Sequence, residues 1–160
     1  MGSRSKIDLA YIAGFLDGDG SLMLQIKKRS DTKRGIRFMA TICFYQDTRH
    51  ENPLLWIRKL FGVGYISQRK DGITELRING YRQVHNILSD LKPFIRFKKI
   101  QAEAMLKATT ACLSSKPYRS LSDKELRSIA NCALTIREAN YKSHNKVKKM
   151  KLYHMLGLTP

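Results

Sequence analysis

Two aspartates set among glycines are the residues in this sequence most suited to chemistry. Asp17, Gly18, Asp19 and Gly20 directly follow an apolar segment with the pattern of a helix over residues 8–18. A helix C-terminus carries roughly half a negative charge, so two carboxylates there need a cation nearby. Carboxylate oxygens bind hard divalent ions, and glycines leave room for a ligand or a second chain. The alternative is a surface turn in which both carboxylates are solvated.

The helix that positions these acids has one face made of small residues. Ala10, Gly14 and Gly18 recur every four residues and therefore share one side of the helix. Such a face lets another backbone approach closely. We expect the N-cap at Asp8. The opposite side is apolar and indicates burial in a core; it comprises Leu9, Ile12, Phe15 and Leu16.

Residues 12–20, with the sequence IAGFLDGDG, resemble the motif that names the LAGLIDADG homing endonucleases. The match is continuous and specific, and similarity to compact single-motif members encoded in group I introns extends through most of the chain. It implies an α+β protein of order αββαββα, in which a four-stranded antiparallel saddle sheet has helices on one face. It also implies a homodimeric, site-specific endonuclease that acts on double-stranded DNA.

Composition independently indicates a polyanionic partner. The formal net charge is +17 and the pI is about 10.1, which favours nucleic acid or an anionic membrane surface. No apolar run approaches the length of a membrane span, and we expect no membrane partner. The cysteines Cys43, Cys112 and Cys132 are odd in number and widely spaced. We interpret them as reduced thiols of an intracellular protein, in the cytoplasm of a prokaryote or in an organelle.

Hydrophobic periodicity predicts one domain over residues 1–160. Alternating residues indicate hairpins over 21–46 and 64–80, with the dipeptide Asp71-Gly72 at the second turn. Helical patterns follow each hairpin, and further helices occupy 98–156. In the first of these we expect Ile100, Met105 and Leu113 to be buried.

The strands present one apolar face and one face rich in basic and amide side chains. A two-stranded ribbon fits the major groove of DNA, where Arg, Lys and Gln can read base edges. The alternative is that this face only meets solvent, and a tail lysine such as Lys142 is equally consistent with solvation or with a phosphate contact. The candidate DNA-binding residues are Ser21, Met23, Gln25, Lys27, Arg29, Arg34, Arg37, Met39, Thr41, Cys43, Tyr45, Ser67, Arg69, Glu75, Arg77 and Lys142.

Hydrolysis of a phosphodiester needs metal-activated water and positive charge on the phosphate. One aspartate per chain is too little to hold two ions, whereas two chains meeting at a dyad bring two carboxylates together. The small-residue face of Ala10, Gly14 and Gly18 suits that dimer interface. The resemblance implies that Asp19 is the metal-binding acid, with the Gly18 carbonyl close to the metal.

The resemblance also assigns roles outside the motif. Gln46 matches a position that arranges water around the metal, and Lys98 matches a lysine that supports the transition-state charge. His50 falls where relatives often carry Arg or Lys, so its catalytic role stays open and Arg49 is a possible substitute. Each of these residues has a simpler interpretation as a strand end, a solvated helix start or a phosphate contact.

The expected cofactor is Mg²⁺ or Mn²⁺, with Ca²⁺ binding without supporting cleavage, and no organic cofactor is expected. The resemblance further implies a long pseudo-palindromic target, short 3′ overhangs and an intron as host. A non-cleaving intron-splicing maturase, or a DNA- or RNA-binding regulator on the same fold, is the competing interpretation. Fold alone does not separate these functions, because function depends on the site.

Overall fold

The computed structural model describes residues 4–30, 35–114, 121–140 and 149–159. Its helices are α1 Lys6–Asp19, α2 Asn52–Phe61, α3 Tyr81–Leu91, α4 Lys99–Ser114, α5 Asp123–Ala139 and α6 Lys149–Met155. Its strands are β1 Gly20–Lys28, β2 Ile36–Asp47, β3 Tyr65–Gln68 and β4 Ile73–Asn79, with short 3₁₀ turns η1 Thr48–His50 and η2 Lys92–Phe94. The order of elements confirms the predicted αββαββα arrangement, which α5 and α6 extend.

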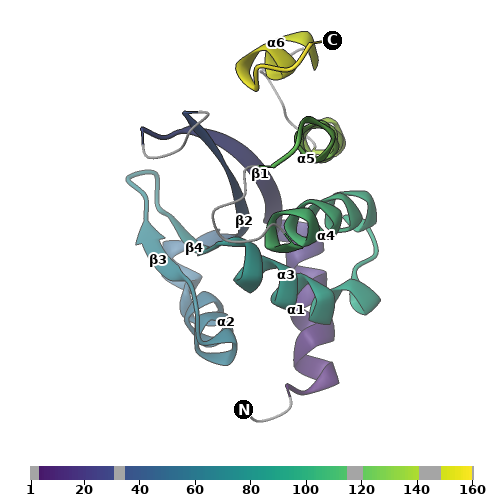
Figure 1. Ribbon diagram of the computed structural model, residues 1–160. Helices are drawn as coiled ribbons and strands as arrows, with labels where there is room; N and C mark the ends of the chain where they lie inside the picture. Colours follow the sequence, from purple (N-terminus) through teal and green to yellow (C-terminus); the bar gives the residue numbers. More distant parts are fainter. Residues whose placement is uncertain (1–3, 31–34, 115–120, 141–148, 160) are drawn as a thin grey trace.

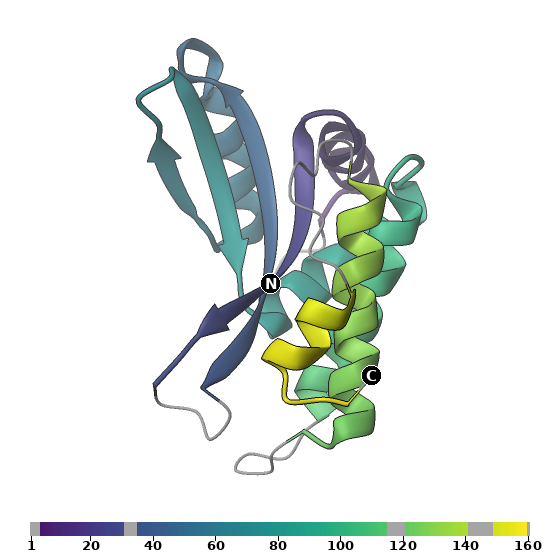
Figure 2. The same cartoon turned by 90° about the horizontal axis from the view of Figure 1, so that it is seen from above.

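The four strands form one antiparallel sheet in the order β1-β2-β4-β3. In its register, Gly20 pairs with Phe44 and Cys43 pairs with both Ser21 and Arg77. Helices α1, α3, α4 and α5 pack against the β1–β2 half, and α2 packs against β3 and β4 (Figure 1). Seen from above, the long strands curve past the helical layer rather than lying flat (Figure 2). This geometry leaves the other face of the sheet uncovered by any of the described helices.

Alternation along the strands decides which side chains enter the core. The even-numbered residues Leu22, Ile42 and Phe44 are fully buried beneath the helices. Helix α1 adds Ile12 and Leu16 to this core, and the Phe15 ring stacks on Phe44 with centroids 5.9 Å apart. Because α1 is anchored by these apolar contacts, its C-terminal end is fixed relative to the sheet.

Two expectations about helices were wrong. Helix α1 begins at Lys6, because the Ser5 hydroxyl rather than Asp8 caps it and accepts a hydrogen bond from the Ile7 amide. In α4, Ile100 and Leu113 are exposed, whereas Met105 is buried as expected. The reason is that α4 packs between α3 and α5, so its buried face consists mainly of small residues. Among the described residues, no helix has the length and apolarity needed to cross a membrane.

The capping box of α5 offers a direct test of this fold. The Ser122 hydroxyl accepts a hydrogen bond from the Glu125 amide, and the Glu125 carboxylate accepts one from the Ser122 amide. We expect Ser122→Ala to lower the free energy of unfolding by about 1 kcal/mol in urea denaturation. Ser89→Ala, on the exposed side of α3, is the control and should cause no loss. Equal loss in both variants would contradict the capping role.

Candidate active site

Asp17 joins the C-terminal end of α1 to the backbone that leads into α4. Its Oδ2 accepts hydrogen bonds from the amides of Arg96 at 2.6 Å and Phe97 at 3.1 Å, and its Oδ1 accepts one from the amide of Lys98 at 2.9 Å. The residue is only 7% exposed. The amides at the start of a helix carry partial positive charge. The sequence indicated that a positive charge is needed beside this carboxylate. Backbone amides supply part of it.

Lys98 is brought to the same place by this contact. Its Nζ donates to the Asp17 backbone carbonyl at 2.5 Å, and the residue is 5% exposed. Burial lowers the pKa of the Lys98 ammonium, while the nearby carboxylates of Asp17 and Asp19 oppose that shift. A buried cation is thus held within electrostatic range of Asp19, as the sequence-based assignment of both residues to one site requires.

The Asp19 side chain is exposed at the end of α1. Within the described residues it has no hydrogen bond or ion pair, so its oxygens are available to a ligand. Those residues also contain no cluster of three His, Cys, Asp or Glu side chains able to hold a metal ion. Asp19 fits a hard divalent cation, but one chain supplies only part of a ligand set.

Gln46 lies at the same end of the sheet. Phe44 pairs with Gly20, the residue that follows α1, and Gln46 comes two residues after Phe44 in β2. Gln46 therefore lies close to the end of α1, on the same side of β2 as the buried Phe44. Its Oε1 accepts a hydrogen bond from the Asp47 amide at 2.8 Å. The register therefore places Gln46 beside the α1 terminus, although its side chain turns back to its own strand.

Arg49 and His50 differ in their freedom to act. The Arg49 guanidinium binds both carboxylate oxygens of Asp47, at 3.0 and 2.8 Å, and lowers the pKa of that carboxyl. His50 is exposed, and among the described residues its ring has no hydrogen bond or salt bridge. Of the two, His50 is the side chain that is free to approach a substrate, while Arg49 stabilises the turn.

The helix-free face of the sheet carries many of the predicted DNA-binding side chains. Those that are exposed or half-buried are Ser21, Met23, Gln25, Lys27, Arg29, Arg37, Met39, Tyr45, Ser67, Arg69 and Arg77. Some are already ordered: the Ser21 and Tyr45 hydroxyls lie 3.1 Å apart, and burial raises the pKa of Tyr45 to about 12. The predicted residues Arg34 and Lys142 lie outside the described residues.

Three residues predicted to contact DNA are buried instead. Thr41 donates to Asn79 Oδ1 at 2.7 Å, and Cys43 lies within the sheet with no exposed surface. Glu75 is 4% exposed and binds Arg69 and Arg77 at 3.1 and 2.7 Å. Its net pKa is lowered, because these guanidinium groups outweigh the effect of its burial. Thr41, Cys43 and Glu75 are therefore corrected to supporting positions beneath the surface.

The small-residue face of α1 is exposed within the described part of the chain. Ala10, Gly14 and Gly18 are exposed, and a Cβ atom built on either glycine meets no other atom within 4 Å. Tyr11, 58% exposed, lies beside this face and makes an edge-to-face contact with Trp56 at 5.8 Å. The sequence analysis did not identify Tyr11 or Trp56 as candidate contact residues. The available signal was that Trp56 is the only tryptophan in the sequence. Exposed apolar patches of this kind mark protein–protein contacts.

Comparison with known proteins identifies related chains. The family described as LAGLIDADG endonuclease matches residues 12–109. The DNA endonuclease I-CreI of Chlamydomonas reinhardtii is 33% identical over 112 residues, which cover 70% of this chain and 68% of that enzyme. The DNA endonuclease I-CvuI of Chlorella vulgaris is 30% identical over 103 residues, and the match covers 64% of each chain. The aligned segment thus spans slightly under two thirds of the Chlorella enzyme.

Solved structures show the same fold. The archaeal intron-encoded homing endonuclease I-Vdi141I, complexed with DNA, superposes with a TM-score of 0.80 and 18% identity, covering 96% of this chain and 97% of that chain. I-CvuI in complex with the I-CreI target gives a TM-score of 0.77 with 22% identity, covering 95% and 94%. I-SmaMI bound to cleaved DNA matches 99% of this chain but only 51% of its own length, with a TM-score of 0.75 and 21% identity.

The Asp17 contact predicts a large loss of stability on a minimal change. Asp17→Asn keeps the shape of the side chain but removes its charge and turns an amide group toward backbone donors. We expect the free energy of unfolding to fall by about 2–4 kcal/mol, measured by denaturant titration. Asp8→Asn in the first turn of the same helix is the control and should cost less than about 1 kcal/mol. Similar losses in both would show that Asp17 has no special role.

Proposed function

This chain belongs to the LAGLIDADG endonuclease family, and from that membership we propose that it is a site-specific homing endonuclease that cleaves double-stranded DNA as a homodimer. The observation that carries the proposal is that the exposed Asp19 carboxylate, which has no hydrogen bond or ion pair among the described residues, lies within electrostatic range of the buried Lys98 ammonium. We further propose that residues 1–160 act as a single endonuclease domain in an intracellular compartment, on a long pseudo-palindromic site.

Two copies of α1 form the centre of the proposed dimer. Contact along Ala10, Gly14 and Gly18 brings the two helix ends together, because the missing side chains allow close backbone approach. Tyr11 and Trp56 extend the contact with apolar surface. Two Asp19 carboxylates then face one duplex across a two-fold axis, which matches a pseudo-palindromic target.

Each side chain at the site has a distinct proposed task. A divalent metal, when bound, activates water and stabilises the leaving oxygen. The Asp19 carboxylate and the Gly18 carbonyl hold that ion, and Gln46 orients the attacking water. Lys98 places a fixed positive charge near the phosphate, and His50 contacts the phosphate from the exposed η1 turn. We propose Mg²⁺ or Mn²⁺ as the working ion and no organic cofactor. The related I-CvuI was solved with the I-CreI target in the presence of 2 mM Mg, with the DNA not cleaved, and with its own target in the presence of 2 mM Ca.

The helix-free face of the sheet is the proposed DNA-binding surface. Lys27, Arg29 and Arg37 project from the long β1–β2 hairpin, and Arg69 and Arg77 project from the second hairpin. Their positive charge favours a surface that follows phosphates, while Gln25 and the arginines can read bases in the major groove. The buried Glu75 holds Arg69 and Arg77 in position for this contact.

A non-cleaving maturase on the same fold remains the competing function. It needs the basic surface but not the exposed acid, so retention of Asp19 next to Lys98 favours the nuclease. The two functions differ in whether phosphodiester bonds are cut.

Asp19→Asn tests the catalytic assignment. The target is first obtained by incubating the protein with Mg²⁺ and a randomised duplex library and sequencing the cut ends. We expect the variant to bind this duplex normally but to cleave it at least about a hundredfold more slowly, because metal-ion stabilisation is worth several kcal/mol. Glu138→Gln, which neutralises an exposed acid on α5, is the control and should cut normally. Undiminished cleavage by the Asp19 variant would refute its role.

Gly14→Leu tests the dimer separately from the fold. A leucine fits the single chain, since nothing lies within 4 Å of a Cβ at Gly14, but it clashes with any helix packed on that face. We expect a folded monomer in sedimentation velocity, with unchanged circular dichroism and no cleavage. Asn86→Leu, on an exposed part of α3, should remain dimeric. A dimeric, active Gly14 variant would place the interface elsewhere.

A further inference from the structure

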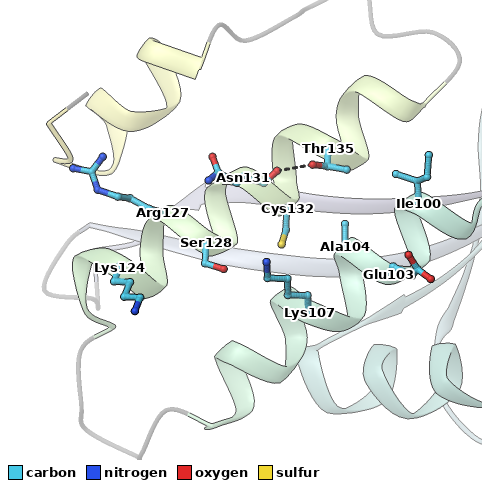
Figure 3. A pocket seen from close by; sticks show the side chains of 10 residues that line it. All are labelled: Ile100, Glu103, Ala104, Lys107, Lys124, Arg127, Ser128, Asn131, Cys132 and Thr135. Atoms are coloured by element: carbon cyan, nitrogen blue, oxygen red, sulfur yellow. Dashed lines mark hydrogen bonds between the residues drawn. The ribbon is translucent and has the colours of Figure 1, made fainter.

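A groove of about 550 Å³ runs between α4 and α5, outside the proposed cleavage site. Figure 3 shows its side chains on the near side of the two helices, with the strands behind them. The groove therefore opens on the helical side of the molecule rather than on the DNA-binding face. Its polar lining includes Lys107 from α4 and Lys124, Arg127, Ser128 and Asn131 from α5.

The cations of this groove are available to a ligand. Lys107 and Lys124 are exposed, and neither forms an ion pair with an acid among the described residues. Glu103 is the one acid among the residues that line the groove, and its Oε1 lies 3.8 Å from the Nζ of Lys92 in the turn η2. The lining thus has three cationic side chains, Lys107, Lys124 and Arg127, against the single acid Glu103, while Asp123 and Glu125 flank Lys124 in the first turn of α5.

Two of the lining side chains are held in place by α6 and the segment after it. The Arg127 guanidinium lies 5.4 Å from the centre of the Tyr153 ring and donates to the Thr159 hydroxyl. The Tyr153 hydroxyl donates to Asn131 Oδ1 at 2.8 Å. Because that oxygen is already used as an acceptor, the Asn131 amide nitrogen can donate to a ligand. The groove consequently offers mainly donors, which suits a ligand that only accepts hydrogen bonds.

The positive surface continues along α4 beyond the groove. A second hollow of about 250 Å³ is lined by Lys92, Arg96 and Lys99 and shares Glu103 with the groove. Lys99 and Lys107 are eight residues apart, or roughly 12 Å along the helix. Donors distributed over such a length fit a chain of phosphates better than a single small anion.

The width of the groove favours single-stranded over double-stranded nucleic acid as its ligand. The axes of packed helices lie about 8–10 Å apart, whereas the two backbones that border the DNA major groove are separated by about 12 Å, so the strip of donors between α4 and α5 follows one backbone at a time. A single strand can place its backbone there. An acidic peptide is less suited, because acidic motifs are recognised by clusters of arginine, whereas this lining contains one arginine, Arg127, beside two lysines.

We propose that the α4–α5 groove binds the sugar–phosphate backbone of single-stranded nucleic acid, separately from the duplex on the sheet. Lys107, Lys124 and Arg127 contact phosphates, and Ser128 and Asn131 donate further hydrogen bonds. This second surface goes beyond the proposed endonuclease function and does not depend on cleavage.

The test measures binding of fluorescent U20 and dT20 by anisotropy while an excess of unlabelled duplex occupies the sheet. We expect binding to persist, and Lys107→Gln and Lys124→Gln each to weaken it about three- to tenfold. Each variant should also reduce the slope of log affinity against log salt by about 0.7, the value for one lost contact to a single strand. The matched control is Arg82→Gln, which removes one exposed charge from α3 and should have little effect.

Several results would overturn the proposal. These are absence of oligonucleotide binding, complete displacement by duplex, equal weakening by Arg82→Gln, or displacement by polyglutamate as effectively as by oligonucleotide. Equal affinity for U20 and dT20 supports recognition of the backbone alone, and a preference identifies RNA or DNA as the source. Duplex cleavage by the Lys107 and Lys124 variants should be unchanged, so failure here leaves the endonuclease proposal intact.

Discussion

The meeting of two helix ends through the Asp17 carboxylate is the interaction on which the rest of the site depends. A carboxylate at the C-terminus of α1 is unfavourable by itself, but three backbone amides at the start of α4 surround it. The same contact fixes the backbone of Lys98, whose ammonium then binds the carbonyl of Asp17. Asp19, two residues further on, is left exposed with a cation behind it. Hydrogen bonds between charged side chains and the backbone, made in the interior, thus fix the position of the exposed Asp19.

The sequence was informative where local periodicity determines structure. Alternation in the hairpins correctly predicted one apolar face for the strands, and Leu22, Ile42 and Phe44 on that face enter the core. It could not predict which groups bind the Asp17 carboxylate, because these are backbone amides about 80 residues away, and a backbone amide does not depend on residue type. It also could not predict that Thr41, Cys43 and Glu75 are buried on the polar face. Alternation along a strand predicts which face of the sheet a side chain lies on. Whether that side chain is buried depends on the neighbouring strands and on the groups that it contacts.

The chain separates its surfaces by chemistry. The open face of the sheet is basic and broad, the outer face of α1 is small and apolar, and the groove between α4 and α5 is basic and narrow. Each property fits the partner proposed for it: a duplex, a second copy of the chain, or a single strand. A net charge of +17 is therefore better understood as several distinct binding surfaces than as general attraction to polyanions.

The long separation between Asp17 and Lys98 also has a kinetic consequence. Contacts between distant residues form late, since closing a long loop costs entropy that local contacts do not recover. Chains generally begin to fold from the N-terminus during synthesis. The motif helix is thus made early, but its carboxylate stays without the amides it needs until residue 98 has left the ribosome. A nascent or truncated chain carries the complete motif without an assembled reaction centre.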